Sequence, residues 1–212
     1  MNCPLCQKSD STKYDEDKFR TYYLCQNCSL VFIPRESILP FAVEAARYDA
    51  HENDDDDANY RNYLAATANA ISELIPKNSV GLDFGCGRTL VMAHIFESHG
   101  NKVDSYDLYF HPKEDIWDKK YDFIVLSEVV EHLSPPAEVM KRLSKLLKFH
   151  GKIFIKTKLY PPDPITFHNW FYKRDQTHVQ FFDYDSMTKL GQIMKMKGPH
   201  KIAAPDLYEF TK

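Results

Sequence analysis

Four cysteines near the N-terminal end have the spacing of a metal site. Cys3 and Cys6 form one Cys-x-x-Cys pair and Cys25 and Cys28 form a second, with 18 residues between the pairs. Two such turns on neighbouring hairpins can direct four thiolates at one point, which is the tetrahedral arrangement of a structural Zn²⁺ ion with no position left open for catalysis. A redox role would require one such motif on a helix. The sequence therefore predicts a structural zinc site in a small ribbon over residues 1–36.

The charge of this N-terminal segment indicates whether it can bind nucleic acid. Residues 1–40 contain five basic and five acidic side chains, and the whole chain has a net charge of −3. Binding to a phosphate backbone depends on clustered Lys and Arg, so a neutral ribbon offers little to nucleic acid. We therefore do not expect nucleic acid as a partner.

A second group of residues has the spacing of a nucleoside site. The stretch VGLDFGCG, residues 80–87, predicts a strand that ends in a glycine-rich turn, where the backbone can approach a ligand closely. Asp107 lies at the end of the next expected strand, where an acidic side chain can bind the two hydroxyls of a ribose. Residues 88–90 supply no third glycine of a G-x-G-x-x-G motif, which disfavours a NAD-dependent dehydrogenase.

Alternating strands and helices are expected to position these residues. Short apolar runs predict strands, and apolar residues at three- and four-residue spacing predict helices. The alternation is typical of a doubly wound α/β sheet, in which ligands lie at the carboxyl ends of the strands. The expected strands are residues 80–84, 102–106, 121–126, 152–157, about 201–203 and 207–210, and the expected helices are 90–99, 137–149 and 186–196.

The segment between the ribbon and this sheet is expected to be helical. A linker bounded by two prolines, residues 34–40, precedes a short predicted helix at 41–53 and a longer one at 60–75 that lies on the sheet. The acidic run Asp54 to Asp57 is interpreted as a solvated loop that caps the longer helix, with metal binding as the lesser alternative. The expected division is 1–36 for the ribbon, 37–76 for a helical cap or linker, and 77–212 for the main domain.

The glycine turn and the later segments resemble class I S-adenosylmethionine-dependent methyltransferases. LDFGCG is similar to their first motif, Asp107 in VDSYDLY to their second-strand acidic position, and YDFIVLSEVVEHL to their fourth-strand motif. LSKLLKFHGKIFIKT is similar to their fifth-strand region. More narrowly, the chain resembles bacterial methyltransferases with a CPxC…CxxC ribbon, an RYDAHEN-like segment and a W…Y…D-x-T-H-V-x-F stretch, here residues 170–181. The resemblance implies a Rossmann-like sheet, mostly parallel with an antiparallel last strand.

The resemblance also implies S-adenosylmethionine as the cofactor. Gly85 and Gly87 would lie against its methionine part, Asp83 would orient its amino group, and Asp107 would bind its ribose. Many members have a third glycine where Thr89 stands, so the Cβ of Thr89 bears on how well the cofactor binds. The full set expected at the cofactor is Asp83, Gly85, Cys86, Gly87, Asp107, Leu108, Ser127 and Glu128.

Two histidines and a carboxylate are candidates for the catalytic groups. Methyl transfer from a sulfonium needs a positioned nucleophile and, for an oxygen or nitrogen acceptor, a base. His178 is the first candidate, because histidine titrates near neutral pH and Asp175 can orient it. His132 follows Glu131 in the loop after the family's fourth strand, where the methyl group and the acceptor should meet. The alternative for each histidine is a structural role, and the aromatic residues 170–172 are expected either to wall the acceptor pocket or to pack in the core.

The expected function is methylation of a small molecule, and related ribbon-bearing enzymes suggest a sugar or similar polar metabolite. One alternative is an RNA-base methyltransferase whose ribbon binds RNA, favoured by the basic residues between 141 and 158. Another is a non-catalytic scaffold that binds a protein partner. No apolar run approaches the ~18 residues of a membrane span, and the first residues lack the apolar stretch of a signal peptide, so we expect a cytoplasmic protein with reduced thiols. The oligomeric state stays open.

Overall fold

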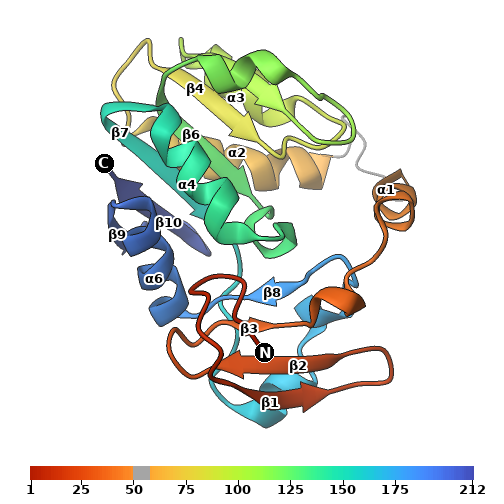
Figure 1. Cartoon of the computed structure of the whole chain (residues 1–212). Helices are drawn as coiled ribbons and strands as arrows, with labels where there is room; N and C mark the ends of the chain where they lie inside the picture. The colour runs from red at the N-terminus through yellow and green to blue at the C-terminus, as the bar shows by residue number, and fades with distance from the viewer. Residues whose placement is uncertain (50–57) are drawn as a thin grey trace.

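The chain folds around a six-stranded sheet (Figure 1). The structure is a computed structural model that describes residues 1–49 and 58–212. The strands of this sheet are β4 (Val80–Phe84), β5 (Lys102–Tyr106), β6 (Tyr121–Ser127), β7 (Leu147–Lys156), β9 (Lys197–Lys201) and β10 (Leu207–Thr211). Their order is β5-β4-β6-β7-β10-β9, with the first three pairings parallel and β10 antiparallel to both neighbours. The predicted α/β sheet, mostly parallel with an antiparallel last strand, is confirmed.

Helices cover both faces of this sheet. They are α2 (Ala58–Ser72) and α3 (Val91–Ser98) on one face, and α4 (Pro136–Leu146) and α6 (Tyr184–Met194) on the other (Figure 1). The central strand β6 serves both layers, because successive side chains of a strand point to opposite faces. Phe123 and Val125 pack with α2 and α3, whereas Ile124 and Leu126 pack with α4 and α6. Burial on both faces explains why residues 123–126 of this strand are all apolar.

A second sheet of four strands contains the N-terminal segment. Its strands are β1 (Ser11–Glu16), β2 (Thr21–Cys25), β3 (Val31–Phe32) and β8 (Gln180–Phe181), paired antiparallel in that order. The strand β8 comes from far along the chain, and it pairs Phe181 with Val31 and Gln180 with Phe32. The N-terminal strands and the segment that follows His178 therefore belong to one sheet (Figure 1).

The helix α1 (Phe41–Asp49) follows the N-terminal strands and lies beside the loop after β5 (Figure 1). The ring of Phe41 stacks on Tyr109 with 4.9 Å between centroids, and Asp49 forms an ion pair with Arg88 at 2.6 Å. The helix expected at 41–53 is observed as far as Asp49. The expected acidic loop, Asp54 to Asp57, lies outside the described residues.

The end of one predicted helix is corrected. The helix expected at 137–149 ends at Leu146, because Leu147 adopts an extended backbone conformation and pairs with Tyr121 in the sheet. Its apolar side chain is buried as a strand residue, although its spacing also suits a helix face.

The strand expected near 201–203 is also corrected, since β9 begins four residues earlier and residues 203–206 form the turn into β10. Gly198 and Pro199 obscured this strand in the sequence, because both residues usually mark loops. The helix α5 (Pro164–His168) and the strands β1 and β8 had not been predicted. Within residues 1–49 and 58–212, no helix combines the length and apolar character of a membrane span.

Candidate active site

The four N-terminal cysteines lie together in space. The Sγ atoms of Cys3 and Cys28 are 3.6 Å apart, and those of Cys6 and Cys25 are 3.5 Å apart. All four Sγ atoms lie within 4.8 Å of one another, and all four cysteines are free. Tetrahedral coordination with Zn–S distances of about 2.3 Å separates the sulfurs by about 3.8 Å, whereas a disulfide requires about 2.05 Å. The spacing therefore fits four thiolates around one zinc ion.

The glycine turn after β4 is tightly packed on one side and open on the other. Gly85 and Gly87 have φ angles of +81° and +69°, which residues with a side chain rarely adopt. The N–H of Gly85 donates to the carbonyl oxygen of Tyr106 at 2.7 Å, so the turn is held against the end of β5. A Cβ on Gly85 would lie 2.4 Å from Cγ2 of Val129, whereas a Cβ on Gly87 would meet no atom within 4 Å. The backbone at Gly87 thus leaves room for a ligand.

Asp107 joins this turn to the end of β5. Its Oδ2 accepts a hydrogen bond from the N–H of Gly87 at 3.0 Å, and its Oδ1 accepts from the N–H groups of Tyr109 at 2.8 Å and Phe110 at 3.1 Å. Each carboxylate oxygen has two lone pairs, so Oδ2 retains capacity for a further donor. A ribose hydroxyl is such a donor.

Buried polar groups beside the turn lack partners. Asp83 is 3% exposed, and burial together with the charge of Asp107 raises its pKa to about 7, with no hydrogen bond from a described residue to offset these effects. The hydroxyl oxygens of Thr89 and Ser127 are buried without a hydrogen-bond partner among the described residues. Such groups are normally satisfied. A ligand with a cationic amine and several polar atoms would satisfy them, so these residues fit S-adenosylmethionine.

The remaining residues expected at the cofactor lie along the same edge. The thiol of Cys86 lies 3.5 Å from the carbonyl oxygen of Gly87, and burial raises the pKa of Cys86 far above its ordinary value, so it stays protonated. Leu108 is 55% exposed, directly after Asp107. Glu128 has a φ of +56°, an uncommon value for a residue with a side chain that often marks functional sites.

Two carboxyl groups after β6 share one tyrosine hydroxyl. The Oη atom of Tyr172 donates at 2.8 Å to Oε2 of Glu128 and also contacts Oε1 of Glu131. Glu131 is 1% exposed and accepts from Oγ1 of Thr157 at 3.1 Å, whereas Glu128 accepts from Oη of Tyr63 at 2.7 Å. Burial and the charge of Glu128 raise the pKa of Glu131 to about 8. A protonated Glu131 can therefore donate to Tyr172, which in turn donates to Glu128.

His132 and His178 lie next to these carboxyl groups. Their ring centroids are 4.6 Å apart, and Nδ1 of His178 lies 2.7 Å from the carbonyl oxygen of Tyr172. The Nε2 atom of His178 is 3.8 Å from Oδ2 of Asp175. Burial lowers the pKa of His178, so its ring is neutral at neutral pH. The three candidate catalytic residues, Glu131, His132 and His178, are thus brought together from two loops.

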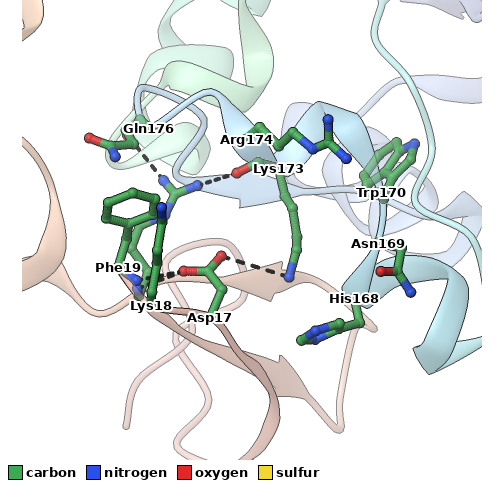
Figure 2. Close-up of a pocket in the computed structure, with 10 residues that line it drawn as sticks. Asp17, Lys18, Phe19, His168, Asn169, Trp170, Lys173, Arg174 and Gln176 are labelled. Atoms are coloured by element: carbon green, nitrogen blue, oxygen red, sulfur yellow. Dashed lines mark hydrogen bonds and ion pairs between the residues drawn. The ribbon is translucent and has the colours of Figure 1, made fainter.

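Arg20 of the β1–β2 hairpin holds the loop that contains His178. Its guanidinium group is buried and donates to four backbone carbonyl oxygens, those of Lys173 at 2.7 Å, Asp175 at 3.1 Å, Gln176 at 3.0 Å and His178 at 2.8 Å. Lys18 and Phe19 of the hairpin and Gln176 of the loop are among the residues that line a hollow of about 400 Å³ (Figure 2). None of the residues that line this hollow belongs to the glycine turn. The hairpin therefore supports the His178 loop and lies apart from the expected cofactor site.

Several of these contacts were not predicted. Tyr63 was expected only as part of a helix that lies on the sheet, and its hydroxyl reaches Glu128. Arg20 contributed only to a charge count, and no sequence pattern marks either contact. Thr157 could have been found, because a polar residue at the carboxyl end of a strand in an α/β sheet points to the ligand edge. The residues of the aromatic stretch 170–172 differ in their surroundings. The hydroxyl of Tyr172 contacts the carboxyl groups of Glu128 and Glu131, whereas the side chain of Phe171 is 59% exposed.

Comparisons with known proteins agree with this fold. A search of curated proteins found no match. The solved structure of 1,6-didemethyltoxoflavin-N1-methyltransferase from Burkholderia thailandensis, with bound 1,6-didemethyltoxoflavin and S-adenosylhomocysteine, is similar with a TM-score of 0.60 and 16% sequence identity. The match covers 88% of this chain and 97% of that chain.

Two O-methyltransferase structures are also similar. An O-methyltransferase family protein from Burkholderia thailandensis has a TM-score of 0.55 and 12% identity, and the match covers 80% of this chain and 62% of that one. An O-methyltransferase family 2 protein from Planctomyces limnophilus, in complex with apigenin, has a TM-score of 0.50 and 12% identity, with 73% and 62% covered. At these identities the likeness shows the fold alone.

Family membership follows from a direct match of the sequence. A family model described as a methyltransferase domain matches residues 57–193, which is more than half of the chain. The matched stretch includes the glycine turn, Asp107 and the Glu131–His132 loop. The chain therefore belongs to the methyltransferase domain family and is an S-adenosylmethionine-dependent methyltransferase.

Proposed function

We propose that this enzyme transfers the methyl group of S-adenosylmethionine to a small polar molecule. The observation that carries the proposal is that two sets of groups adjoin at the carboxyl edge of the parallel strands. The glycine turn with Asp83 and Asp107 forms one set, and the cluster of Glu131, His132 and His178 forms the other. The end of β6 connects them, which is where a methyl donor and an acceptor would meet.

The first set would bind the cofactor. S-adenosylmethionine would supply an electrophilic methyl group on its sulfonium. In this assignment the ionised carboxylate of Asp83 attracts the cofactor's amino group, and Oδ2 of Asp107 accepts from its ribose. The hydroxyls of Thr89 and Ser127 are buried and without described partners, so both can bond to polar atoms of the cofactor. Thr89 would then add a contact where many relatives have glycine.

The second set would bind the acceptor and remove its proton. His178 is the first candidate for the base, because its ring is held neutral by burial and its Nδ1 is engaged by a backbone carbonyl. That contact leaves the lone pair of Nε2, which lies 3.8 Å from Oδ2 of Asp175, to take a proton from the acceptor. Tyr172 would hold Glu131 and Glu128 in place beside the acceptor, through the contacts of its hydroxyl with both carboxyl groups.

The charge distribution favours a small acceptor over RNA. Three of the seven basic residues that kept RNA open as an alternative form ion pairs, since Lys148 pairs with Asp122, Lys152 with Glu209 and Lys158 with Asp206. Binding to a phosphate backbone requires clustered basic groups that are available for release of counterions. A sugar or similar polar metabolite is the acceptor class we propose. The toxoflavin precursor and the apigenin bound by two similar structures are also small molecules.

The N-terminal ribbon would act as a structural part of the acceptor site. Zinc held by Cys3, Cys6, Cys25 and Cys28 would fix the hairpin that contains Arg20, and Arg20 holds the loop of His178. In this view residues 1–36 are the zinc ribbon, 37–76 the helical cap or linker, and 77–212 the methyltransferase domain.

Two experiments test the proposal. Isothermal titration calorimetry with S-adenosylhomocysteine should give one site per chain in the zinc-loaded protein, and the Asp107→Asn variant should bind at least about tenfold more weakly, because a ribose contact to a charged group is lost. Mass spectrometry of a metabolite extract, incubated with enzyme and cofactor, should show a product heavier by one methylene group that depends on both. Absence of cofactor binding in the zinc-loaded protein would refute the proposed activity.

A further inference from the structure

Glu131, His132 and His178 form a second cluster of metal-ligating groups, separate from the cysteines. One ligand atom from each residue lies within 4.8 Å of the other two. Glu131 and His132 belong to the 3-10 turn after β6, and His178 belongs to the loop that leads to β8. The N–H of Val179 donates to the carbonyl oxygen of Glu131 at 3.0 Å, which ties the two loops together. The backbone therefore holds the three side chains near one point in the absence of any ligand.

Backbone carbonyls determine how both imidazole rings are presented. The Nδ1 atom of His178 is 2.7 Å from the carbonyl oxygen of Tyr172, and Nδ1 of His132 is 3.1 Å from the carbonyl oxygen of Thr177. A carbonyl oxygen only accepts hydrogen bonds, so Nδ1 of His178 carries the hydrogen and its neutral ring has the lone pair on Nε2. The Nδ1 atom of His132 also lies 3.0 Å from Oη of Tyr48, which donates to Oε1 of Glu44, so both neighbours of this Nδ1 can accept its hydrogen. Metal-bound histidines usually have this arrangement, in which the second ring nitrogen donates to a carbonyl or carboxylate.

The charges around the cluster are unbalanced. Glu128, Glu131 and Asp175 place three carboxyl groups here, and the salt bridges of the described residues include none from Lys or Arg to any of them. The Oδ2 atom of Asp175 lies 3.8 Å from Nε2 of His178, and its Oδ1 accepts from the N–H of Thr177 at 2.9 Å and from Oγ1 of Thr177 at 2.7 Å. The nearby guanidinium of Arg20 is occupied by four backbone carbonyl oxygens. Of the three, Glu131 is buried, and its ionised form without a cationic partner is costly; a bound cation would supply that partner.

We propose that Glu131, His132 and His178 together bind one divalent transition-metal ion such as Mn²⁺, Co²⁺ or Zn²⁺. Two imidazoles and one carboxylate suit these ions, whereas Mg²⁺ and Ca²⁺ prefer oxygen ligands throughout. Coordination at about 2.1 Å places ligand atoms roughly 3.0–3.4 Å apart, so the three side chains close inward on binding. Three protein ligands leave further positions open, and an oxygen of the acceptor can occupy one.

This inference rests on the proposed function and changes one part of it. His178 becomes a metal ligand, and the ion takes over the activation of the acceptor oxygen that was assigned to a free base. An acceptor with a hydroxyl next to a second oxygen, as in a sugar or a carboxylic acid derivative, is the class that such an ion would hold best, because it offers two oxygen ligands.

Metal counting on the intact, zinc-saturated chain tests the inference. After removal of free zinc by gel filtration, elemental analysis should find two zinc ions per wild-type chain, one at the cysteines and one at the cluster. The Glu131→Gln, His132→Gln and His178→Gln variants should each retain one. His94→Gln, at an exposed histidine on α3, is the matched control and should retain two. Mn²⁺ titrated into protein with one zinc per chain should bind at one site by electron paramagnetic resonance, at least about 30-fold more weakly in each of the three variants.

The outcomes separate this inference from the proposed function. One zinc per wild-type chain together with no Mn²⁺ binding at millimolar concentration would overturn the metal site. A second metal retained equally by all three variants would overturn it too. Binding of S-adenosylhomocysteine, measured on the same samples, reports on the proposed function alone and also shows that each variant is folded. Metal binding without cofactor binding would refute the proposed methyl transfer and leave the metal site standing.

Discussion

Asp83 provides a direct test of the cofactor site through pH. Its carboxyl group is 3% exposed, and burial together with the charge of Asp107 raises its pKa to about 7. The amino group of S-adenosylmethionine is cationic at neutral pH and favours the ionised carboxylate. Binding therefore lowers the pKa of Asp83 and releases a proton wherever the free enzyme is protonated. We expect cofactor affinity to fall as the pH falls through 7 and to be constant above it.

The size of this effect follows from the fraction of ionised Asp83. When only the ionised form binds, the apparent Kd is the intrinsic Kd divided by that fraction. With a pKa of about 7 for Asp83, the apparent Kd is about tenfold higher at pH 6 than at pH 8, and about 100-fold higher at pH 5. An aspartate with its ordinary pKa would be ionised over this whole range and would give almost no change. The change in apparent Kd between pH 5 and 7 therefore shows whether the pKa of Asp83 is raised or ordinary.

Calorimetric titration with S-adenosylhomocysteine measures this slope, because the product keeps the amino group. Titrations in two buffers of different ionisation enthalpy should show about one proton released per ligand at pH 6 and almost none at pH 8. Asp83→Asn should remove the pH dependence and weaken binding at pH 8. Asp118→Asn, at an exposed carboxyl group in the loop before β6, is the control and should give the wild-type curve. An affinity in the wild type that is flat from pH 5.5 to 8, or an unchanged slope in Asp83→Asn, would refute this account of Asp83.

Four further predictions concern the ribbon and the glycine turn. Removal of zinc by a chelator, or Cys25→Ser, should unfold the ribbon and speed hydrogen exchange in residues 173–181, while the Kd of S-adenosylhomocysteine changes less than about threefold; protection that survives loss of the metal would contradict this. Arg20→Met should also speed exchange in that loop, because four carbonyl oxygens lose their donor, and Lys18→Met on the same hairpin is its control. Gly87→Ala should cost about 1 kcal/mol of stability through its positive φ and fill the open space, so cofactor affinity drops about tenfold or more. Gly85→Ala should lower the melting temperature further, because its Cβ would lie 2.4 Å from a neighbouring side chain; equal melting temperatures would contradict that order.

The fold was predictable because its strands are short apolar runs. The expected strands at 80–84 and 102–106 match β4 and β5 residue for residue, and that at 121–126 misses only the last residue of β6. Burial on both faces forces the middle of β6, residues 123–126, to be apolar at every position, which is a strong pattern. β9 was misplaced because its sequence, KGPHK, contains no apolar residue apart from Pro199, and its strand conformation follows from pairing with β10.

The candidate site was predictable where a local motif defines it and unpredictable where tertiary contacts do. The four cysteines and the pair of Gly87 with Asp107 follow from spacing along the chain, and in the structure both sets lie together. Arg20 lies more than 150 residues from the loop that it holds, and Tyr63 lies 65 residues from Glu128. Such contacts depend on how the two sheets are joined, and a single sequence contains no periodicity that reports them.

The placement of β8 explains why the ribbon should affect the acceptor cluster more than the cofactor site. The N–H of Ile33, next to β3, donates to the carbonyl oxygen of Val179 at 3.0 Å, and the N–H of Val179 donates to the carbonyl oxygen of Glu131 at the same distance. One peptide segment thus separates the ribbon from the turn that contains Glu131 and His132. The glycine turn is held instead by the carbonyl oxygen of Tyr106 at the end of β5, in the other sheet. A disturbance that begins at the cysteines therefore reaches the acceptor groups through two hydrogen bonds, whereas the cofactor groups keep their own support.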